Sequence, residues 1–98
     1  MIVVRVCLTS KEENISALSA VLANDVTNTN AFDGCVRYDV YQGINDECEF
    51  ILYEEWENQQ SFDAYKASDY FKDIGGKIFP LLDGTPDSAY YQAELIPQ

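Results

Sequence analysis

The sequence predicts an α+β fold with the element order βαββαβ. Four segments alternate apolar and polar residues with the period of two that is typical of strands, and two segments carry apolar residues at the three- and four-residue spacing of helices. A chain of 98 residues supports one small hydrophobic core. We therefore expect residues 1–98 to form a single domain.

The first strand is expected over Ile2–Thr9, where alternate residues are apolar. Ser10 and Glu13 have the spacing of a capping box, which predicts that a helix begins directly after Ser10. Apolar residues at helical spacing follow, and the helix should end within the polar stretch 24–30. The segment 32–34 reads as a turn into the second strand.

The next two strands form a predicted hairpin. Cys35–Gln42 and Glu49–Trp56 both alternate, and the polar segment between them reads as their connection. Both faces of the second of these strands are apolar, with Leu52 on one face and Ile51 on the other.

A second helical region follows the hairpin. Asn58 is a plausible N-cap, a break is expected near Ser68, and Pro80 should weaken or end the helix. Ser88–Ile96 reads as the fourth strand. Right-handed crossovers turn this order into a ferredoxin-like fold, in which a four-stranded antiparallel sheet carries both helices on one face.

The open face of such a sheet predicts a partner. Apolar residues occur on both faces of the strands, whereas the helices can cover only one. A small monomer rarely leaves so broad an apolar patch in water. We expect a homodimer.

Composition excludes several classes of function. The net charge of −11, from 17 acidic and 6 basic residues, repels phosphate, so we expect neither nucleic acid nor an anionic membrane as a partner. The absence of histidine removes His-ligated metal sites and Ser-His or Cys-His catalysis. The three cysteines lack C-x-x-C spacing, so we expect buried free thiols and no metal. With no apolar run of about 20 residues and no secretory leader expected, the chain reads as cytoplasmic.

Three segments in the middle of the chain resemble the antibiotic biosynthesis monooxygenase domain family. Gly34–Gln42 and Phe50–Glu57 resemble its second and third strands, and Phe62–Phe71 resembles the helical segment that follows. The resemblance implies a dimeric α/β barrel with one pocket per subunit between sheet and helices. It also implies monooxygenation of phenolic or quinol substrates by O₂, with no metal or flavin cofactor. Other branches of the superfamily isomerise a phosphorylated sugar derivative or degrade haem.

The sequence departs from the family pattern at four positions. Tyr65 and Tyr70 stand where histidines are usual, Asp69 where proline is usual, and Leu52 where the polyketide oxidases have an asparagine. These departures disfavour the histidine-dependent isomerase and the asparagine-assisted oxygenase, and the lack of histidine disfavours haem degradation. Two functions remain: a cofactor-independent monooxygenase of a small aromatic quinol, phenolic or enolic substrate, or a non-catalytic small-molecule-binding or regulatory module.

Three residues are candidates for catalysis. Glu54 shares a strand face with apolar residues, where desolvation would raise its pKa and suit it to act as a general base. Trp56, two residues on, could be a wall against a flat substrate, or a core aromatic. Tyr65 is expected at the pocket mouth, where its phenol could donate a hydrogen bond to an oxyanion.

Five further residues are candidates for binding substrate. Arg37 could anchor an anion or enolate, although on so acidic a chain it could equally pair with a neighbouring carboxylate. Lys66 reads either as solvated or as substrate-facing, because it follows Tyr65. The whole set is Arg37, Leu52, Lys66, Tyr70 and Phe71.

Overall fold

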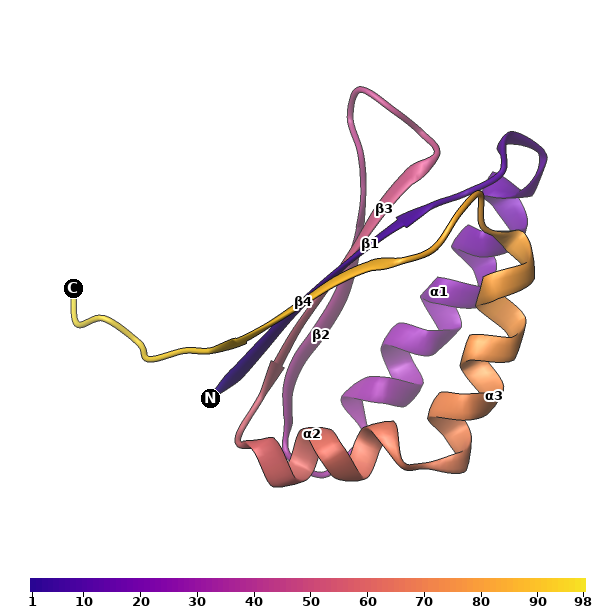
Figure 1. Cartoon of the computed structure of the whole chain (residues 1–98). Helices are drawn as coiled ribbons and strands as arrows, with labels where there is room; N and C mark the ends of the chain where they lie inside the picture. Colours follow the sequence, from indigo (N-terminus) through magenta and orange to yellow (C-terminus); the bar gives the residue numbers. More distant parts are fainter.

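A four-stranded antiparallel sheet with helices on one side forms the structure, a computed structural model that describes residues 1–98 (Figure 1). The strand order is β2-β3-β1-β4. This is the predicted ferredoxin-like α+β fold, with the second helical region divided in two. The elements are β1 (Ile2–Thr9), α1 (Ile15–Asn30), β2 (Cys35–Gln42), β3 (Glu49–Trp56), α2 (Gln59–Lys66), α3 (Asp69–Ile78) and β4 (Asp87–Gln92), with short 3₁₀ helices at Glu12–Asn14 and Phe79–Leu81.

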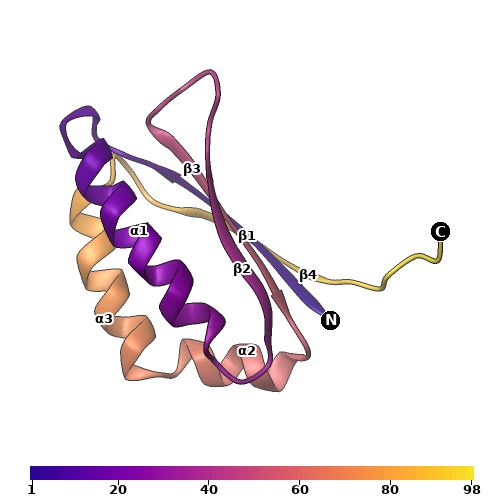
Figure 2. The same cartoon turned by 180° about the vertical axis from the view of Figure 1, so that it is seen from behind.

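The core lies between the sheet and the helices. Alternate residues of β1 and β3 are buried against the helices, as the period of two predicted. Figures 1 and 2 agree that α1 and α3 lie side by side over this inner face, with α2 at one end. The buried apolar residues of the helices are Leu18, Leu22, Phe62, Tyr65, Ile74 and Ile78.

The start of the first helix differs from the predicted capping box. Ser10 is buried, forms an isolated bridge with Leu82, and its hydroxyl donates to the carbonyl of Lys11. Its hydroxyl accepts no hydrogen bond from a helix N–H. A 3₁₀ turn intervenes, and α1 begins after Asn14, whose side chain makes no capping bond. The prediction was wrong because Ser10 continues the pairing of β1, with its N–H bonded to the carbonyl of Cys48 and a bridge to Leu82.

The break in the second helical region is confirmed. Asn58 caps α2 by accepting a hydrogen bond from the backbone N–H of Ser61 at 2.9 Å. Ser68 caps α3 by accepting from the N–H of Phe71 at 3.1 Å, while its hydroxyl donates to the carbonyl of Tyr65. One serine thus terminates α2 and starts α3.

The fourth strand is shorter than predicted. It ends at Gln92, which pairs with Ile2 at the start of β1, instead of continuing to Ile96. After Ala93, which still bonds to the backbone of Met1, the chain has no neighbouring strand to pair with. Residues 93–98 run away from the helices (Figure 1).

A glycine fixes the turn before β2. Gly34 has a φ of +80°, and a Cβ atom there would clash with the side chain of Ser61. Its carbonyl also accepts the N–H of Glu57 at 2.8 Å. The turn therefore packs directly against the start of α2, and only glycine fits both the backbone conformation and the space.

The cysteines are half-buried free thiols, less enclosed than predicted. No three Cys, Asp or Glu side chains are grouped so that they could hold a metal ion. None of the helices has the length and apolar character needed to cross a bilayer.

Candidate functional site

A cavity of about 470 Å³ lies between the inner face of the sheet and the helices α2 and α3. Its size suits a small organic molecule. Most of its lining is apolar, with two carboxylates and two lysines among the exceptions. The lining residues used below are Asp25, Tyr38, Leu52, Glu54, Phe62, Tyr65, Lys66, Phe71, Lys72, Phe79, Ser88 and Tyr90.

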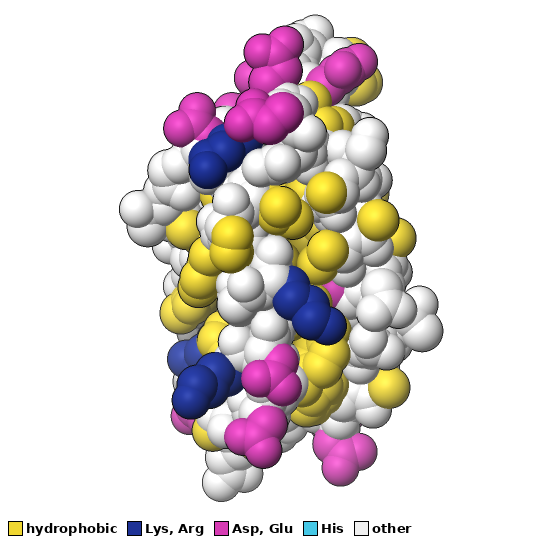
Figure 3. Space-filling model, turned by 90° about the vertical axis from the view of Figure 1, so that its right-hand side faces the viewer, with side chains coloured by type: hydrophobic (Ala, Val, Ile, Leu, Met, Phe, Trp, Pro, Cys, Tyr) yellow, Lys and Arg dark blue, Asp and Glu magenta, His cyan; other side chains and the backbone are white.

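The exposure of the lining residues separates a floor from a mouth. Glu54 and Asp25 retain only 4% and 1% of their accessible surface, so they lie on the floor. Phe79 of the short 3₁₀ helix, Lys72 of α3 and Tyr90 of β4 are exposed. The cavity therefore opens between α3 and the edge strand of the sheet. On this helix-bearing side, a lysine or arginine lies among hydrophobic side chains (Figure 3).

Glu54 presents one carboxylate oxygen to the cavity. Its Oε1 accepts the indole N–H of Trp56 at 3.0 Å, whereas Oε2 has no hydrogen-bond partner in the protein. Every side-chain oxygen that is fully buried in this protein has a hydrogen-bond partner. Because Oε2 has none, it is not fully buried, and the cavity that Glu54 lines is where it is exposed. Burial raises the pKa of Glu54 to about 7, the Trp56 bond opposes this, and the charge of Asp25 adds to it. A carboxylate that titrates near neutrality can accept a proton from a weak acid.

Trp56 lies beneath the site and not in its wall. Its side chain is fully buried and does not line the cavity. The indole stacks on Tyr65 with ring centroids 4.7 Å apart. Of the two roles that the sequence left open for Trp56, the structure shows the core aromatic; it contacts Glu54 and Tyr65, which do line the cavity.

Tyr65 lies deeper than the predicted position at the mouth. It is buried, lines the cavity, and makes an edge-to-face contact with Phe71 at 5.1 Å. Burial, and then the nearby charge of Glu54, raises the pKa of Tyr65 well above that of a free phenol. Its hydroxyl is therefore a hydrogen-bond donor near neutral pH and not a base.

Asp25 is a functional candidate that the sequence reasoning missed. Its Oδ1 accepts from the hydroxyls of Thr29 at 2.8 Å and Tyr70 at 2.5 Å, and its Oδ2 accepts from Tyr38 at 2.5 Å. These bonds join α1, α3 and β2 at the cavity floor. A signal was present, since Asp25 continues the apolar stripe through Leu18 at helical spacing, where a polar residue is unexpected.

Tyr70 serves this network and does not line the cavity. Burial, together with the hydrogen bond to Asp25, raises its pKa to about 12. Three other predicted binding residues do line the cavity: Leu52 on the floor, with Lys66 and Phe71 toward the mouth.

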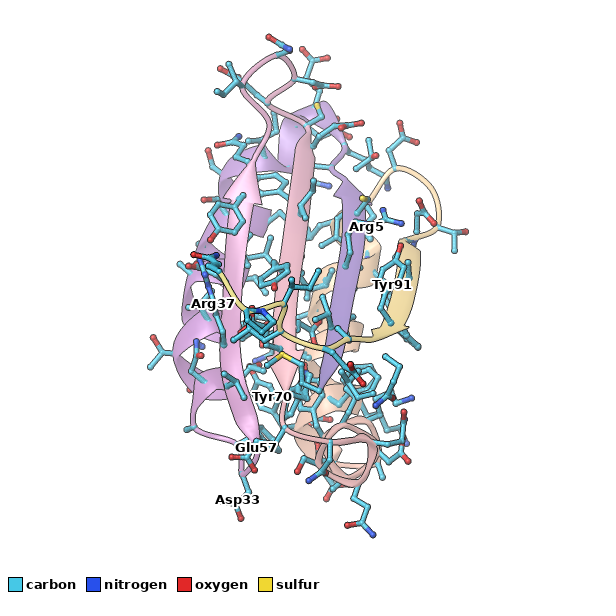
Figure 4. The ribbon with its side chains drawn as sticks, turned by 90° about the vertical axis from the view of Figure 1, so that its left-hand side faces the viewer. Arg5, Asp33, Arg37, Glu57, Tyr70 and Tyr91 are labelled. Carbon is cyan, nitrogen blue, oxygen red and sulfur yellow. The ribbon has the colours of Figure 1, made fainter.

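Arg37 lies on the opposite face of the sheet from the cavity. It pairs with Glu55 across the strands, and a β-bulge precedes it. Its guanidinium donates to the hydroxyl of Tyr41 at 2.6 Å and lies 5.6 Å from the ring centroid of Tyr53. Figure 4, which views this open face, shows Arg37 and Tyr91 on it. Within this chain, Arg37 cannot reach a molecule in the cavity.

Sequence comparison identifies relatives across most of the chain. The sequence profile of the family described as antibiotic biosynthesis monooxygenase matches residues 1–76. The Mycobacterium tuberculosis protein Rv0793, named a monooxygenase without a stated substrate, is 33% identical over 67 residues, which are 68% of this chain and 65% of the relative. The match thus spans just under two thirds of that relative's own length.

Solved structures share the fold over nearly the whole chain. A protein from Deinococcus radiodurans described as an antibiotic biosynthesis monooxygenase has a TM-score of 0.93 at 19% identity, covering 100% of this chain and 97% of its own. SnoaB of Streptomyces nogalater, described as a cofactor-independent oxygenase, has a TM-score of 0.86 at 14% identity. The match covers 99% of this chain and 97% of SnoaB. At these identities the likeness concerns the fold. Together with the profile match over residues 1–76, it means that the chain belongs to the antibiotic biosynthesis monooxygenase family.

Proposed function

We propose that this chain is a monooxygenase that uses O₂, without metal or flavin, on a small aromatic quinol, phenolic or enolic substrate. The observation that supports this most directly is Glu54, which offers one unpaired oxygen to a largely apolar cavity and has a pKa raised to about 7. Such a group can remove a proton from a substrate whose anion then reacts with O₂.

The proposed reaction needs no electron donor besides the substrate. In the simplest case, Glu54 removes a proton from a carbon that carries two hydrogens, and the resulting carbanion or enolate reacts with O₂. One oxygen atom becomes a carbonyl on that carbon, and the other leaves as water with both hydrogens. The four electrons that reduce O₂ all come from this carbon. The protein supplies deprotonation, orientation and exclusion of water.

Other residues in and around the cavity would position the substrate. Tyr65 would donate a hydrogen bond to the oxygen on which negative charge develops, because its hydroxyl stays protonated. Leu52 and Phe71 would enclose the ring as apolar walls. Trp56 would act through Glu54, by fixing one of its oxygens.

We further propose that the protein acts as a homodimer joined through the open face of the sheet. Tyr41, Ile51 and Tyr91 are between 40% and 51% exposed on that face. Leu95 and Ile96 add 90% and 81% exposed side chains in the segment after β4. A second copy would bury this apolar area. A stable monomer mass in light scattering at micromolar concentration would contradict the proposal.

A non-catalytic binding module is the second candidate, and Leu52 is the observation that favours it. This leucine lines the cavity at the position where the resemblance places an asparagine. A leucine cannot hydrogen-bond an oxygenated intermediate, so binding without turnover is consistent with this floor.

Oxygen uptake with a panel of anthrones and quinols tests the proposal. The wild type should consume O₂ with at least one member, and Glu54→Gln should lower the rate by about 10²–10⁴-fold. Glu57→Gln is the matched control, because Glu57 is exposed just beyond β3 and does not line the cavity. Binding of panel members with no uptake would favour the module, and full uptake by Glu54→Gln would exclude Glu54 as the base.

A further inference from the structure

The cations of this protein are unevenly placed. The chain carries only 6 Lys and Arg against 17 Asp and Glu. Two of the six, Lys66 and Lys72, line the cavity. Both lie toward the mouth, since Lys66 is half-buried and Lys72 is exposed, whereas the carboxylates of the lining lie on the floor.

Aromatic rings hold Lys66 at the mouth. Its Nζ lies 4.4 Å from the ring centroid of Phe62 and 5.1 Å from that of Tyr90, and both rings line the cavity. Cation–π attraction to two rings restrains a side chain that would otherwise extend into water. Asp63, one turn earlier on α2, lies 3.7 Å from the ammonium.

Lys72 has no carboxylate partner within 4.0 Å. The protein contains two ion pairs, Lys66 with Asp63 and Arg5 with Asp87. On a chain this acidic, an unpaired lysine at the opening of an apolar cavity leaves a positive charge available to a ligand.

The two ends of the cavity therefore have opposite electrostatic character. Asp25 and Glu54 on the floor repel an anionic group, and the lysines at the mouth attract one. A ligand with a neutral acidic O–H or C–H at one end and a negative charge at the other would fit in only one orientation. That orientation brings the acidic proton to Glu54.

We propose that Lys66 and Lys72 form a cationic rim that selects substrates bearing a carboxylate on the far end of the aromatic or enolic ring. The inference rests on the proposed function of the same cavity, whose substrate class it narrows. A singly charged group suits the site. Asp63 neutralises the charge of Lys66, so the two lysines and Asp63 together carry one net positive charge. A doubly charged phosphate would leave negative charge uncompensated beside the carboxylates of the floor.

Equilibrium binding of two ring-matched probes tests the proposal without any turnover. The probes are 6-hydroxy-2-naphthoate, with hydroxyl and carboxylate at opposite ends of the ring system, and 2-naphthol, which lacks the carboxylate. Calorimetric titration of the wild type in low salt should give tighter binding of the naphthoate. Added salt should narrow this preference, because it screens the exposed charges of the rim.

Substitution of the rim should remove the preference. Lys66→Met and Lys72→Met keep the apolar stems and remove the charges, and each should weaken naphthoate binding by about 2- to 5-fold, the range of an exposed charge pair. The double variant should bind the naphthoate about 10-fold more weakly and leave 2-naphthol unchanged. Lys77→Met is the matched control, since Lys77 is an exposed lysine of α3 that does not line the cavity.

Equal loss for both probes in the double variant, or no loss for either, would overturn the proposal. So would an equal effect of Lys77→Met, because the preference would then reflect net charge and not the rim. These outcomes are independent of the proposed activity, which fails on oxygen uptake and on Glu54→Gln. Charge-dependent naphthoate binding without oxygen uptake would support the rim and contradict the proposed activity. Oxygen uptake without charge-dependent binding would do the reverse.

Discussion

The indole N–H of Trp56 donates a 3.0 Å hydrogen bond to Oε1 of Glu54, two residues earlier on the same strand face. Both side chains are buried. The bond satisfies one oxygen of the carboxylate and turns the other toward the cavity. A second pair on β3 has the same spacing on the opposite face, where the hydroxyl of Tyr53 donates to Glu55.

Trp56→Phe should raise the pKa of Glu54 further. The hydrogen bond from Trp56 lowers this pKa against the effect of burial, so its loss favours the protonated acid. The carboxyl carbon resonance of Glu54, followed by NMR against pH, should titrate at higher pH in the variant. Tyr53→Phe removes the equivalent bond on the other face and should leave the Glu54 titration in place. An unchanged titration in Trp56→Phe would contradict the role given to the indole.

The pH dependence of stability should carry the signature of Glu54. Its pKa rises from 4.5 to about 7 on folding, so between these values the folded state holds a proton that the unfolded state has lost. The free energy of unfolding therefore falls as pH rises from about 4.5 to 7, by roughly 3 kcal/mol from this group, and levels off above.

Denaturant unfolding of wild type and Glu54→Gln across pH 4 to 8 measures this contribution. The glutamine does not titrate. The difference in free energy of unfolding between the two proteins should therefore change between about pH 4.5 and 7 and stay constant above pH 7. A difference that is constant throughout would mean that Glu54 is not desolvated in the folded protein.

Tyr38→Phe should destabilise the protein more than Tyr70→Phe. The hydroxyl of Tyr38 is the donor to Oδ2 of Asp25, whereas Oδ1 keeps Thr29 when Tyr70 is removed. Loss of a buried hydrogen bond to a charged group costs about 1.5–3 kcal/mol, and we expect about 1 kcal/mol or less for the half-buried Tyr70. Urea unfolding midpoints would rank the two variants. The reverse order would mean that Tyr70 is the principal donor to this carboxylate.

Gly34→Ala should destabilise the protein more than Gly84→Ala. Both glycines have positive φ, but a Cβ at Gly34 meets the side chain of Ser61 and one at Gly84 meets nothing within 4 Å. Backbone strain of about 1–2 kcal/mol is common to both, and the clash adds about 1–3 kcal/mol at Gly34. Thermal or urea unfolding would measure the larger loss of stability in Gly34→Ala. Adding Ser61→Gly should recover part of the Gly34→Ala loss, and no recovery would assign the loss to strain alone.

The fold was predictable because local patterns and topology agree. The bounds predicted for β1, β2 and β3 match the structure, since period-two alternation continued to the end of each strand. The predictions failed where the structure of a segment depends on a residue far away in the sequence. Ser10 looked like a helix cap, but Cys48 and Leu82 pair with it at the end of β1. Ile96 continued an alternating pattern for which no neighbouring strand exists.

The candidate site was predictable where its residues lie on one face of a single strand. Leu52 and Glu54 line the cavity together because alternate residues of a strand share a face. Asp25 required knowledge of which hydroxyls α3 and β2 bring to α1, and no local pattern supplies that. Arg37 was a candidate by charge alone, and the register of β2 places it on the other face.

The break at Ser68 gives α3 its own start, so that part of the cavity lining lies on a separate helix. The floor groups Glu54 and Tyr38 belong to the sheet, whereas Phe71 and Lys72 belong to a helix that starts afresh from its own cap. Changes at Phe71 and Lys72 can therefore alter what enters the cavity, whereas Tyr70 of the same helix has to stay, because it donates to Asp25 on the floor. For protein engineering, ligand range can be diversified at these two lining positions of α3 while the carboxylates of the floor are left in place.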